Sequence, residues 1–275
     1  MMVISDIIGG LGNQMFMYAA ARRVSLMQGV KLKLNTTHFQ SSYGWRRYGL
    51  NNLSIVEDIA GIEDLTTVLY QGHIYSEPGP FSFDPKLDRV AVPVYMRGYF
   101  QSFRYLEGVE DSIRSEFQVR TPPAGQNAQL LEMIRGSNSV AVHIRRGDYV
   151  TDPGVARMHG ALPLDYYLWA LRLIVHRAGA ATLFVFSDDI YWAQANLATG
   201  LPTVFVGHNG PDQDYEDLRL MSACKHFVIA NSSFSWWAAW LGTHEGKIVC
   251  APARWMASNP DTSDLIPESW TRIAL

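Results

Sequence analysis

The first thirty-five residues change from an apolar run to a glycine turn, a helical pattern and a second apolar run. Four of the residues at 3–8 are Val or Ile, which is typical of a buried strand, and the run ends in GGLG at 9–12. Residues 13–28 are predicted to form a helix because apolar side chains recur from Phe16 to Met27 at spacings of four and three. Gly29 is a suitable end for this helix, and residues 30–34 form the next predicted strand. The pattern therefore predicts a βαβ unit at the start of the chain.

Residues 35–138 carry a weaker pattern, with Tyr, Gly, Asn and Pro scattered along them. Within this region the sequence predicts an extended segment at 92–100 and a helix near 102–117. The run TPPAG at 121–125 is typical of a linker. We therefore expect an N-terminal α/β domain over residues 1–125 and a C-terminal domain over residues 126–275.

The second part of the chain alternates more regularly between apolar runs and helical patterns. Strands are predicted at 139–144, 182–187, 203–206, 227–230 and 247–251. Helices are predicted at 164–177, 190–198, 214–224 and 233–241. Continuous apolar strands separated by helices indicate a parallel sheet covered on both faces. Two α/β halves of this kind predict a cleft between them, lined by the carboxyl ends of strands.

Composition and charge narrow the class of protein. Of the 275 residues, 48% are hydrophobic and 18% are charged, which excludes a disordered, collagenous or coiled-coil chain. The formal net charge of −3 argues against binding to nucleic acid, which depends on many cationic contacts. The chain has two cysteines, too few for a disulfide framework. It has no apolar run of the ~18 residues that a membrane span needs, and its first residues lack the basic region of a signal peptide. We therefore expect a cytoplasmic protein without a transmembrane segment.

Three short segments carry candidate chemistry. In GGLGNQMF (9–16), glycines before a helix allow a ligand to approach the backbone. A plain tight turn also explains these glycines, and no P-loop lysine follows them.

In VAVHIRRGDY (140–149), a buried strand ends in two arginines and an aspartate. An arginine fork suits a diphosphate, and a surface ion pair is the alternative. In VIANSSFSWWAAWLG (228–242), serines precede a helix that is apolar on all sides. Its start suits an anion or an ordinary helix cap, and its tryptophans favour core packing over sugar stacking.

Two acidic segments and several absent motifs complete the set. DQD at 212–214 matches a metal-binding pattern of some glycosyltransferases, but carboxylates at a helix start also suit the helix dipole, so no metal site is predicted. SDD at 187–189 ends a strand, where a carboxylate either reaches a ligand or caps the next helix. No zinc-binding histidine spacing and no hydrolase motif is present.

Taken together, the order and spacing of these segments resemble a known family. GGLGNQMF (9–16), HIRRGDY (143–149), DLRLMSACKH (217–226) and VIANSSFSWWAAWL (228–241) are similar to motifs of the α-1,2-fucosyltransferases of glycosyltransferase family 11. GYFQSFRY (98–105) is similar to an internal pattern of that family. The resemblance covers nearly the whole chain, is weakest across 35–90, and departs at Met17, where family members more often carry glutamine.

The resemblance implies a GT-B fold, in which two Rossmann-like domains face a cleft. It implies inverting transfer of L-fucose from GDP-β-L-fucose to the 2-hydroxyl of a β-galactoside, with no cofactor and no obligatory metal. Without a metal, a fixed cation must stabilise the diphosphate leaving group, and Arg145 is the best-placed candidate.

The resemblance also assigns expected roles to individual positions, with Arg146 expected to be structural. The expected catalytic residues are Arg145, Asn13, His143 and Asp148, where Asp148 orients the arginine. The expected donor-binding residues are Arg145 at the β-phosphate, His143, Asp188, Asn231, Ser232, Ser233, Phe234 and Gly12. The expected acceptor-binding residues are Asn13 and Gln14.

Three questions stay open at this point. No carboxylate in the motifs is placed as a general base, so the departing phosphate is an alternative proton acceptor. The alternatives to this function are a fucosyltransferase of another linkage and a catalytically silent glycan-binding protein on the same fold. The acceptor is an oligosaccharide or a lipid-linked glycan, and the latter would place the enzyme at the inner face of a membrane.

Overall fold

The computed structural model describes residues 1–40 and 46–274 and divides the chain into two compact units. The first unit comprises Met1–Arg120 together with Asp261–Pro267. The second unit comprises Thr121–Pro260 and the residues from Glu268 onward. The predicted boundary after residue 125 lies five residues beyond this division, and the return of 261–267 to the first unit is absent from the prediction.

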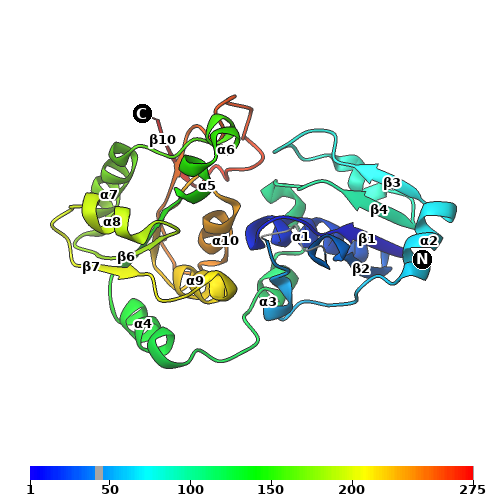
Figure 1. The fold of residues 1–275 in the computed structure, drawn as a ribbon, viewed down its shortest axis with the longest axis horizontal. Helices are drawn as coiled ribbons and strands as arrows, with labels where there is room; N and C mark the ends of the chain where they lie inside the picture. The colour runs from blue at the N-terminus through cyan, green and yellow to red at the C-terminus, as the bar shows by residue number, and fades with distance from the viewer. Residues whose placement is uncertain (41–45, 275) are drawn as a thin grey trace. The chain divides into compact units, whose positions relative to one another are not determined.

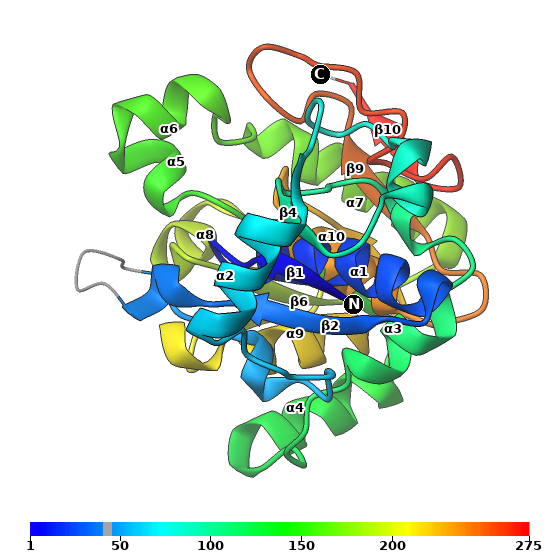
Figure 2. The same ribbon diagram turned by 90° about the vertical axis from the view of Figure 1, so that its right-hand side faces the viewer.

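Within the described residues, the first unit is built on a parallel sheet of four strands in the order β2-β1-β4-β3, all of which Figure 1 labels. Figure 2 shows β2, β1 and β4 from another side. The strands are β1 Met2–Asp6, β2 Lys31–Asn35, β3 His73–Ser76 and β4 Val94–Arg97. The central strand β1 is buried along Val3–Ser5 because it has neighbours on both edges. The predicted strands near 3–8 and 30–34 are confirmed with small shifts at their ends.

Helix α1 (Leu11–Gln28) crosses between β1 and β2 and completes the predicted βαβ unit. It is buried on most of its surface, and it ends at Gly29, whose left-handed φ of 64° suits glycine. The other helical segments of this unit are α2 Ile62–Gln71, α3 Glu110–Glu116 and the 3₁₀ turns η1 Thr37–Gln40, η2 Leu50–Asn52, η3 Pro85–Arg89 and η4 Phe103–Leu106.

Two predictions for this unit are corrected. The single helix expected near 102–117 is two pieces, η4 and α3, because Gly108 between them has a φ of 80° that no helix contains. The extended segment expected at 92–100 is a strand only over β4, since Gly98 and Phe100 turn the chain with φ angles of 147° and 51°.

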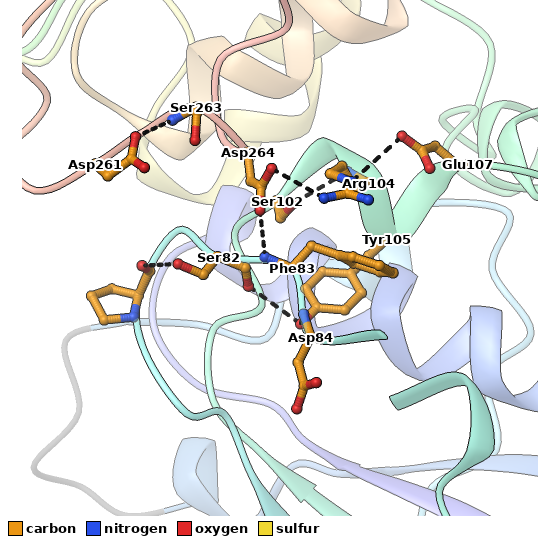
Figure 3. Close-up of polar contacts among 11 residues, drawn as sticks. Ser82, Phe83, Asp84, Ser102, Arg104, Tyr105, Glu107, Asp261, Ser263 and Asp264 are labelled. Carbon is orange, nitrogen blue, oxygen red and sulfur yellow. Dashed lines mark hydrogen bonds and ion pairs between the residues drawn. The ribbon is translucent and has the colours of Figure 1, made fainter. Parts of the chain in front are cut away.

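The segment 261–267 leaves the second unit and packs on the first through Asp264 (Figure 3). The carbonyl oxygen of Asp264 accepts a hydrogen bond from the Phe103 N–H, and its carboxylate accepts one from the Phe83 N–H at 2.9 Å. Arg104 lies 3.5 Å from the same carboxylate and stacks on the Phe83 ring at 4.6 Å. Leu265 and Ile266 beside it are fully buried, so the segment is part of the core of the first unit.

The second unit contains a parallel sheet of six strands in the order β10-β9-β8-β5-β6-β7. The strands are β5 Ser139–Ile144, β6 Thr182–Ser187, β7 Thr203–Val206, β8 His226–Val228, β9 Val249–Pro252 and β10 Thr271–Ile273. The first strand of this unit, β5, lies in the middle of the sheet, and β6 and β7 follow on one side of it. The chain then returns to the other side of β5 with β8 and continues outward with β9 and β10. This is the strand order of the Rossmann fold.

Helices cover both faces of this sheet, with α7 and α8 on one face and α9 and α10 on the other (Figure 1). The helices are α4 Gly125–Gly136, α5 Gly147–Thr151, α6 Pro153–Met158, α7 Leu164–Ala178, α8 Ile190–Asn196, α9 Asp214–Ser222 and α10 Ser233–Leu241, with the 3₁₀ turn η5 at Pro211–Gln213. The four predicted helices are confirmed, whereas α4, α5 and α6 are additional. None of the helices in the described residues is long and apolar enough to cross a membrane.

Candidate active site

The strand order of the second unit has a switch point between β5 and β8. From these two neighbours the sheet builds outward in opposite directions. In open parallel sheets, ligands bind beyond the carboxyl ends of two such strands. Residues 145–148 follow β5 and residues 229–234 follow β8, so two segments singled out in the sequence flank this point.

Arg145 is the first residue beyond β5, and its guanidinium lies between two carboxylates. Its Nη2 is 2.5 Å from Oδ1 of Asp148, and its Nη1 is 2.8 Å from Oδ2 of Asp188. The guanidinium carbon also lies 5.3 Å from the centre of the Tyr149 ring. The ion pair that the expected role of Asp148 requires is thus present, and 19% of the Arg145 side chain is exposed.

Asp188 follows β6 and binds both arginine residues at the end of β5. Besides its ion pair with Arg145, it accepts a hydrogen bond from the backbone N–H of Arg146 at 2.8 Å. Gly147 leaves room for it, since a Cβ there would lie 2.5 Å from Oδ2 of Asp188. The structure therefore places Asp188 beside the arginine, a position that its expected donor-binding role did not specify.

Arg146 points to a different set of partners from Arg145. Its Nε is 3.3 Å from Oδ2 of Asp189, and its guanidinium stacks on Trp192 at 3.9 Å. Asp189 also caps α8 by accepting the Trp192 N–H. These contacts support the structural role expected for Arg146. Asp189 belongs to the SDD segment, for which capping of the next helix was one of the two alternatives, whereas Trp192 was not singled out in the sequence.

His143 lies on the fully buried strand β5 and is only 6% exposed. Burial and then the positive charge of Arg145 lower the pKa of His143 to about 3, so its ring is neutral at physiological pH. Within the described part of the chain its Nδ1 has no hydrogen-bond partner. The ring centre lies 5.8 Å from that of Phe234, which brings these two expected donor-binding residues together.

Asn231 differs from its expected role as a diphosphate contact. Its Nδ2 lies 3.2 Å from each of three carbonyl oxygens, those of His159, Gly160 and Trp255. Its own carbonyl accepts a hydrogen bond from the Tyr149 hydroxyl at 3.1 Å. With 2% exposure, Asn231 joins the loop before α7 to the loop after β9, and its side-chain amide has no donor left for a phosphate.

The start of α10 is held by the core behind it. Ser232 is the N-cap residue, its side chain makes no capping hydrogen bond, and Ser233 and Phe234 form the first half-buried turn. Trp236 and Trp237 are fully buried and pack edge to face at 5.1 Å, and Trp240 is 9% exposed. The predicted packing role of these tryptophans is confirmed.

The first unit gathers the other expected residues at the turn between β1 and α1. Gly9 has a φ of 75°, Gly10 precedes the helix, and Gly12 is buried in its first turn. Oδ1 of Asn13 accepts a hydrogen bond from Nε2 of Gln101 at 2.9 Å. Gln101 ends the GYFQ segment, and it is a polar partner that the sequence pattern pointed to without a role.

Gln14 is fully buried, and its amide is used by the protein itself. Nε2 donates to the carbonyl oxygens of Gly9 and Arg47 at 2.8 and 2.7 Å, and Oε1 accepts the Gly49 N–H at 2.9 Å. This corrects the expected direct contact with an acceptor, because an amide with these partners and no exposed surface cannot reach a sugar. Gln14 instead ties the loop at 47–49 to the glycine turn.

The acidic segment DQD at 212–214 spans the end of η5 and the start of α9. Among the described residues, no group of three or more His, Cys, Asp or Glu side chains is arranged to hold a metal ion. The nearby Asp217 is hydrogen-bonded by Nδ2 of Asn209 at 2.7 Å, and burial raises its pKa to about 7.

Comparison with known proteins decides the family. The model of glycosyltransferase family 11 matches residues 84–274, which is more than half of the chain. The chain is 33% identical to the O-antigen biosynthesis glycosyltransferase WbnK of Escherichia coli, over 98% of this chain and 99% of that one. The chain belongs to glycosyltransferase family 11.

Other similar proteins share this family's chemistry or fold. An alpha-1,2-colitosyltransferase of Escherichia coli is 31% identical over 98% of both chains, and bovine galactoside alpha-(1,2)-fucosyltransferase 2 is 26% identical over 86% of this chain and 68% of its own. The crystal structure of the fucosyltransferase NodZ from Bradyrhizobium has a TM-score of 0.52 at 17% identity, covering 86% of this chain and 91% of that one. This likeness supports the expected GT-B type of α/β fold for this family 11 glycosyltransferase.

Proposed function

We propose that this glycosyltransferase transfers L-fucose from GDP-β-L-fucose to the 2-hydroxyl of a terminal β-galactoside, with inversion and without an obligatory metal. The observation that carries the proposal is Arg145 at the switch point of the second unit, fixed by Asp148 and Asp188. Such a cation suits the charge that develops on a departing diphosphate. The names of the relatives, which include galactoside 2-fucosyltransferases, support the sugar and the linkage.

The proposed reaction breaks the bond between C1 of fucose and the β-phosphate oxygen, and the electron pair leaves with GDP. The 2-oxygen of galactose forms the new bond to C1, and its proton passes to the departing phosphate in a loose, oxocarbenium-like transition state. In this reaction Arg145 stabilises the β-phosphate, and neutral His143 contacts the ribose or a phosphate. Asp148 orients Arg145 before the donor binds. Ser232, Ser233 and Phe234 complete the donor site, and Gly12 and Asn13 supply the first unit's contacts.

An acceptor panel tests the linkage. The purified protein is incubated with GDP-fucose and with lactose, N-acetyllactosamine and galactosyl-N-acetylhexosamine, and the products are analysed by NMR. Fucα1-2Gal is the expected linkage, and any other linkage rejects this part of the proposal. Binding of a galactoside with no transfer from any donor would instead favour a silent glycan-binding protein.

Colitosyl transfer is a second candidate, because the chain is 31% identical to a colitosyltransferase over almost its whole length. Colitose is the 3-deoxy form of fucose, so the two donors differ by one hydroxyl. Competition between GDP-fucose and GDP-colitose on one acceptor separates the candidates. A kcat/KM at least about tenfold higher for GDP-colitose would replace fucose as the proposed donor.

The proposal of metal independence has its own test. Activity is measured after treatment with EDTA and after adding back Mg²⁺ or Mn²⁺. Unchanged activity is expected because a fixed arginine carries the required charge. Activity that is lost with EDTA and restored by the ion would reject metal independence and direct attention to Asp212 and Asp214.

A further inference from the structure

The charge around Arg145 presents a problem that the proposed function does not solve. The two arginines beyond β5 and the three aspartates paired with them carry a net charge of −1. A diphosphate brings further negative charge into this cluster, and like charges at such distances repel strongly. Displacement of one of the two carboxylates from Arg145 would relieve this repulsion when Arg145 binds a phosphate.

Asp188 is the carboxylate that is held more firmly. Its two oxygens bind different groups, with Oδ2 on the Arg145 guanidinium and Oδ1 on the Arg146 N–H. It follows β6, which pairs with β5 along all six residues up to Ile144↔Ser187. It also fills the space above Gly147. Asp188 therefore belongs to the rigid end of the sheet.

Asp148 is held on a less constrained part of the chain. It lies in the five-residue helix α5, which is followed directly by the six-residue helix α6 before the longer α7. Its ion pair with Arg145 links neighbouring turns of the chain, three residues apart, and 22% of its side chain is exposed. Asp188 is exposed to a similar extent, at 26%, so the difference between the two carboxylates lies in the segments that hold them. A partly exposed pair between close neighbours in sequence contributes little net free energy and is exchanged for a stronger anion.

We propose that Asp148 is a resident counter-ion that the diphosphate displaces from Arg145, whereas Asp188 stays bound and positions the guanidinium. This inference rests on the proposed diphosphate donor and deepens it. Arg145 is paired with Asp188 throughout the reaction. Asp148 returns to Arg145 when the nucleotide leaves. Asp148 thereby weakens nucleotide binding and favours its release, and Asp188 strengthens binding by fixing Arg145.

The proposal predicts that substitutions of the two aspartates that contact Arg145 change the affinity for GDP in opposite directions. In Asp148→Asn the competing charge is lost, and we expect GDP to bind about tenfold tighter by titration calorimetry. In Asp188→Asn the amide oxygen still accepts the Arg146 N–H but no longer holds the Arg145 charge, and we expect about tenfold weaker binding. Glu245→Gln is the matched control, because Glu245 is exposed in the loop between α10 and β9 and its change also removes one negative charge. Its affinity for GDP should stay within about twofold of the wild type.

Two further readouts separate positioning from a loss of fold. Asp148→Asn is expected to lower the donor KM while kcat at saturating donor holds or falls through slower release. Asp188→Asn is expected to raise the donor KM and lower kcat together, with a melting temperature close to that of the wild type. Tighter binding in both variants would show that neither carboxylate positions Arg145, and weaker binding in Asp148→Asn would show that Asp148 stays on Arg145 in the complex. Either result overturns the proposal.

Inorganic pyrophosphate and UDP distinguish failure of this inference from failure of the proposed function. If GDP has no advantage over UDP but the opposite signs persist with pyrophosphate, the counter-ion stands and the guanosine donor is rejected. If GDP-fucose is turned over but the signs are equal, the donor stands and the counter-ion is rejected. If the wild type binds none of these anions, both are rejected.

Discussion

The two units carry the same kind of turn with opposite chemistry. In the first unit the turn between β1 and α1 offers glycines and, in the first turn of α1, the neutral amide of Asn13, which is hydrogen-bonded to Gln101. In the second unit the turn between β5 and α5 offers Arg145 within an ionic cluster. Amides suit hydroxyl groups, and a planar guanidinium suits a diphosphate. Equivalent positions in two parallel sheets thus differ in their chemistry through a few side chains.

The two turns also differ in the partners of Gln14 and Arg145, which are backbone groups for Gln14 and carboxylates for Arg145. Gln14 is buried with two donor contacts and one acceptor contact, all to backbone groups that no ligand displaces. Arg145 is bound by two carboxylates, of which one is exchangeable in the proposal above. The first turn is therefore shaped by permanent hydrogen bonds, whereas the second is balanced by ion pairs that respond to an incoming charge.

The largest effect on stability is expected in the core behind the start of α10. Trp237→Ala removes a fully buried ring behind the start of α10, and we expect the free energy of unfolding to fall by about 3–5 kcal/mol. Denaturant unfolding measures this loss. Trp169→Ala is the control, since 54% of Trp169 is exposed on α7, and it should cost less than about 1 kcal/mol. A stable Trp237→Ala protein that no longer recognises acceptor would show that the ring serves the site and not the core.

The charged turn is tested next through Arg145→Ala. We expect turnover to fall by about 10²–10³-fold, the usual loss when a fixed charge-stabilising group is removed. Arg145→Lys keeps the charge but loses the two-sided contact with Asp148 and Asp188, so it should recover only part of the activity. Steady-state kinetics with GDP-fucose measure both, and circular dichroism monitors the fold. Near-wild-type turnover in Arg145→Ala would remove Arg145 from the mechanism.

The strands of the second unit show what a sequence pattern predicts well. The predicted bounds of β5, β6 and β7 match the structure, because buried parallel strands are continuous apolar runs with polar ends. The strand β3 was missed because it lies at the edge of its sheet and is largely exposed, so no apolar pattern marks it. The break at Gly108 was missed because a glycine inside a helical pattern is compatible with a helix until its φ is known.

The site was predictable to the level of segments and not of contacts. The end of β5 was identified from HIRRGD, because charges directly after a buried strand require an explanation. The hydrogen bond from the Arg146 N–H to Asp188 joins positions 42 residues apart and depends on the pairing of β5 with β6. Asn231 and Gln14 were assigned to ligands through the family resemblance, whereas the structure shows both side chains buried and hydrogen-bonded to the protein's own backbone.

The neutral turn is tested by comparing its two amides. Gln14→Ala leaves the Gly49 N–H without its acceptor inside the protein, and we expect a loss of about 1–3 kcal/mol in stability. Asn13→Ala loses the contact with Gln101 and should cost less stability while raising the acceptor KM. Thermal melts and acceptor kinetics on the two variants measure the contrast. If Gln14→Ala melts like the wild type and only acceptor binding suffers, the original expectation for Gln14 would be restored.

The smallest effect is expected from protonation of His143, because its ring stays neutral beside the arginines. Its pKa is lowered by burial and by Arg145 to about 3, below the ~6.5 of an unfolded chain. Between these values only the unfolded state binds the proton, so the stability contributed by neutral His143 is complete above about pH 6.5 and is lost as pH falls toward 3. In the folded protein, NMR of the imidazole nitrogens from pH 5 to 8 should therefore show one neutral tautomer, with the urea-unfolded protein as reference. A midpoint near pH 6 in the folded protein would mean that His143 adds a positive charge to the second turn, and the net charge of the cluster would then vary with pH.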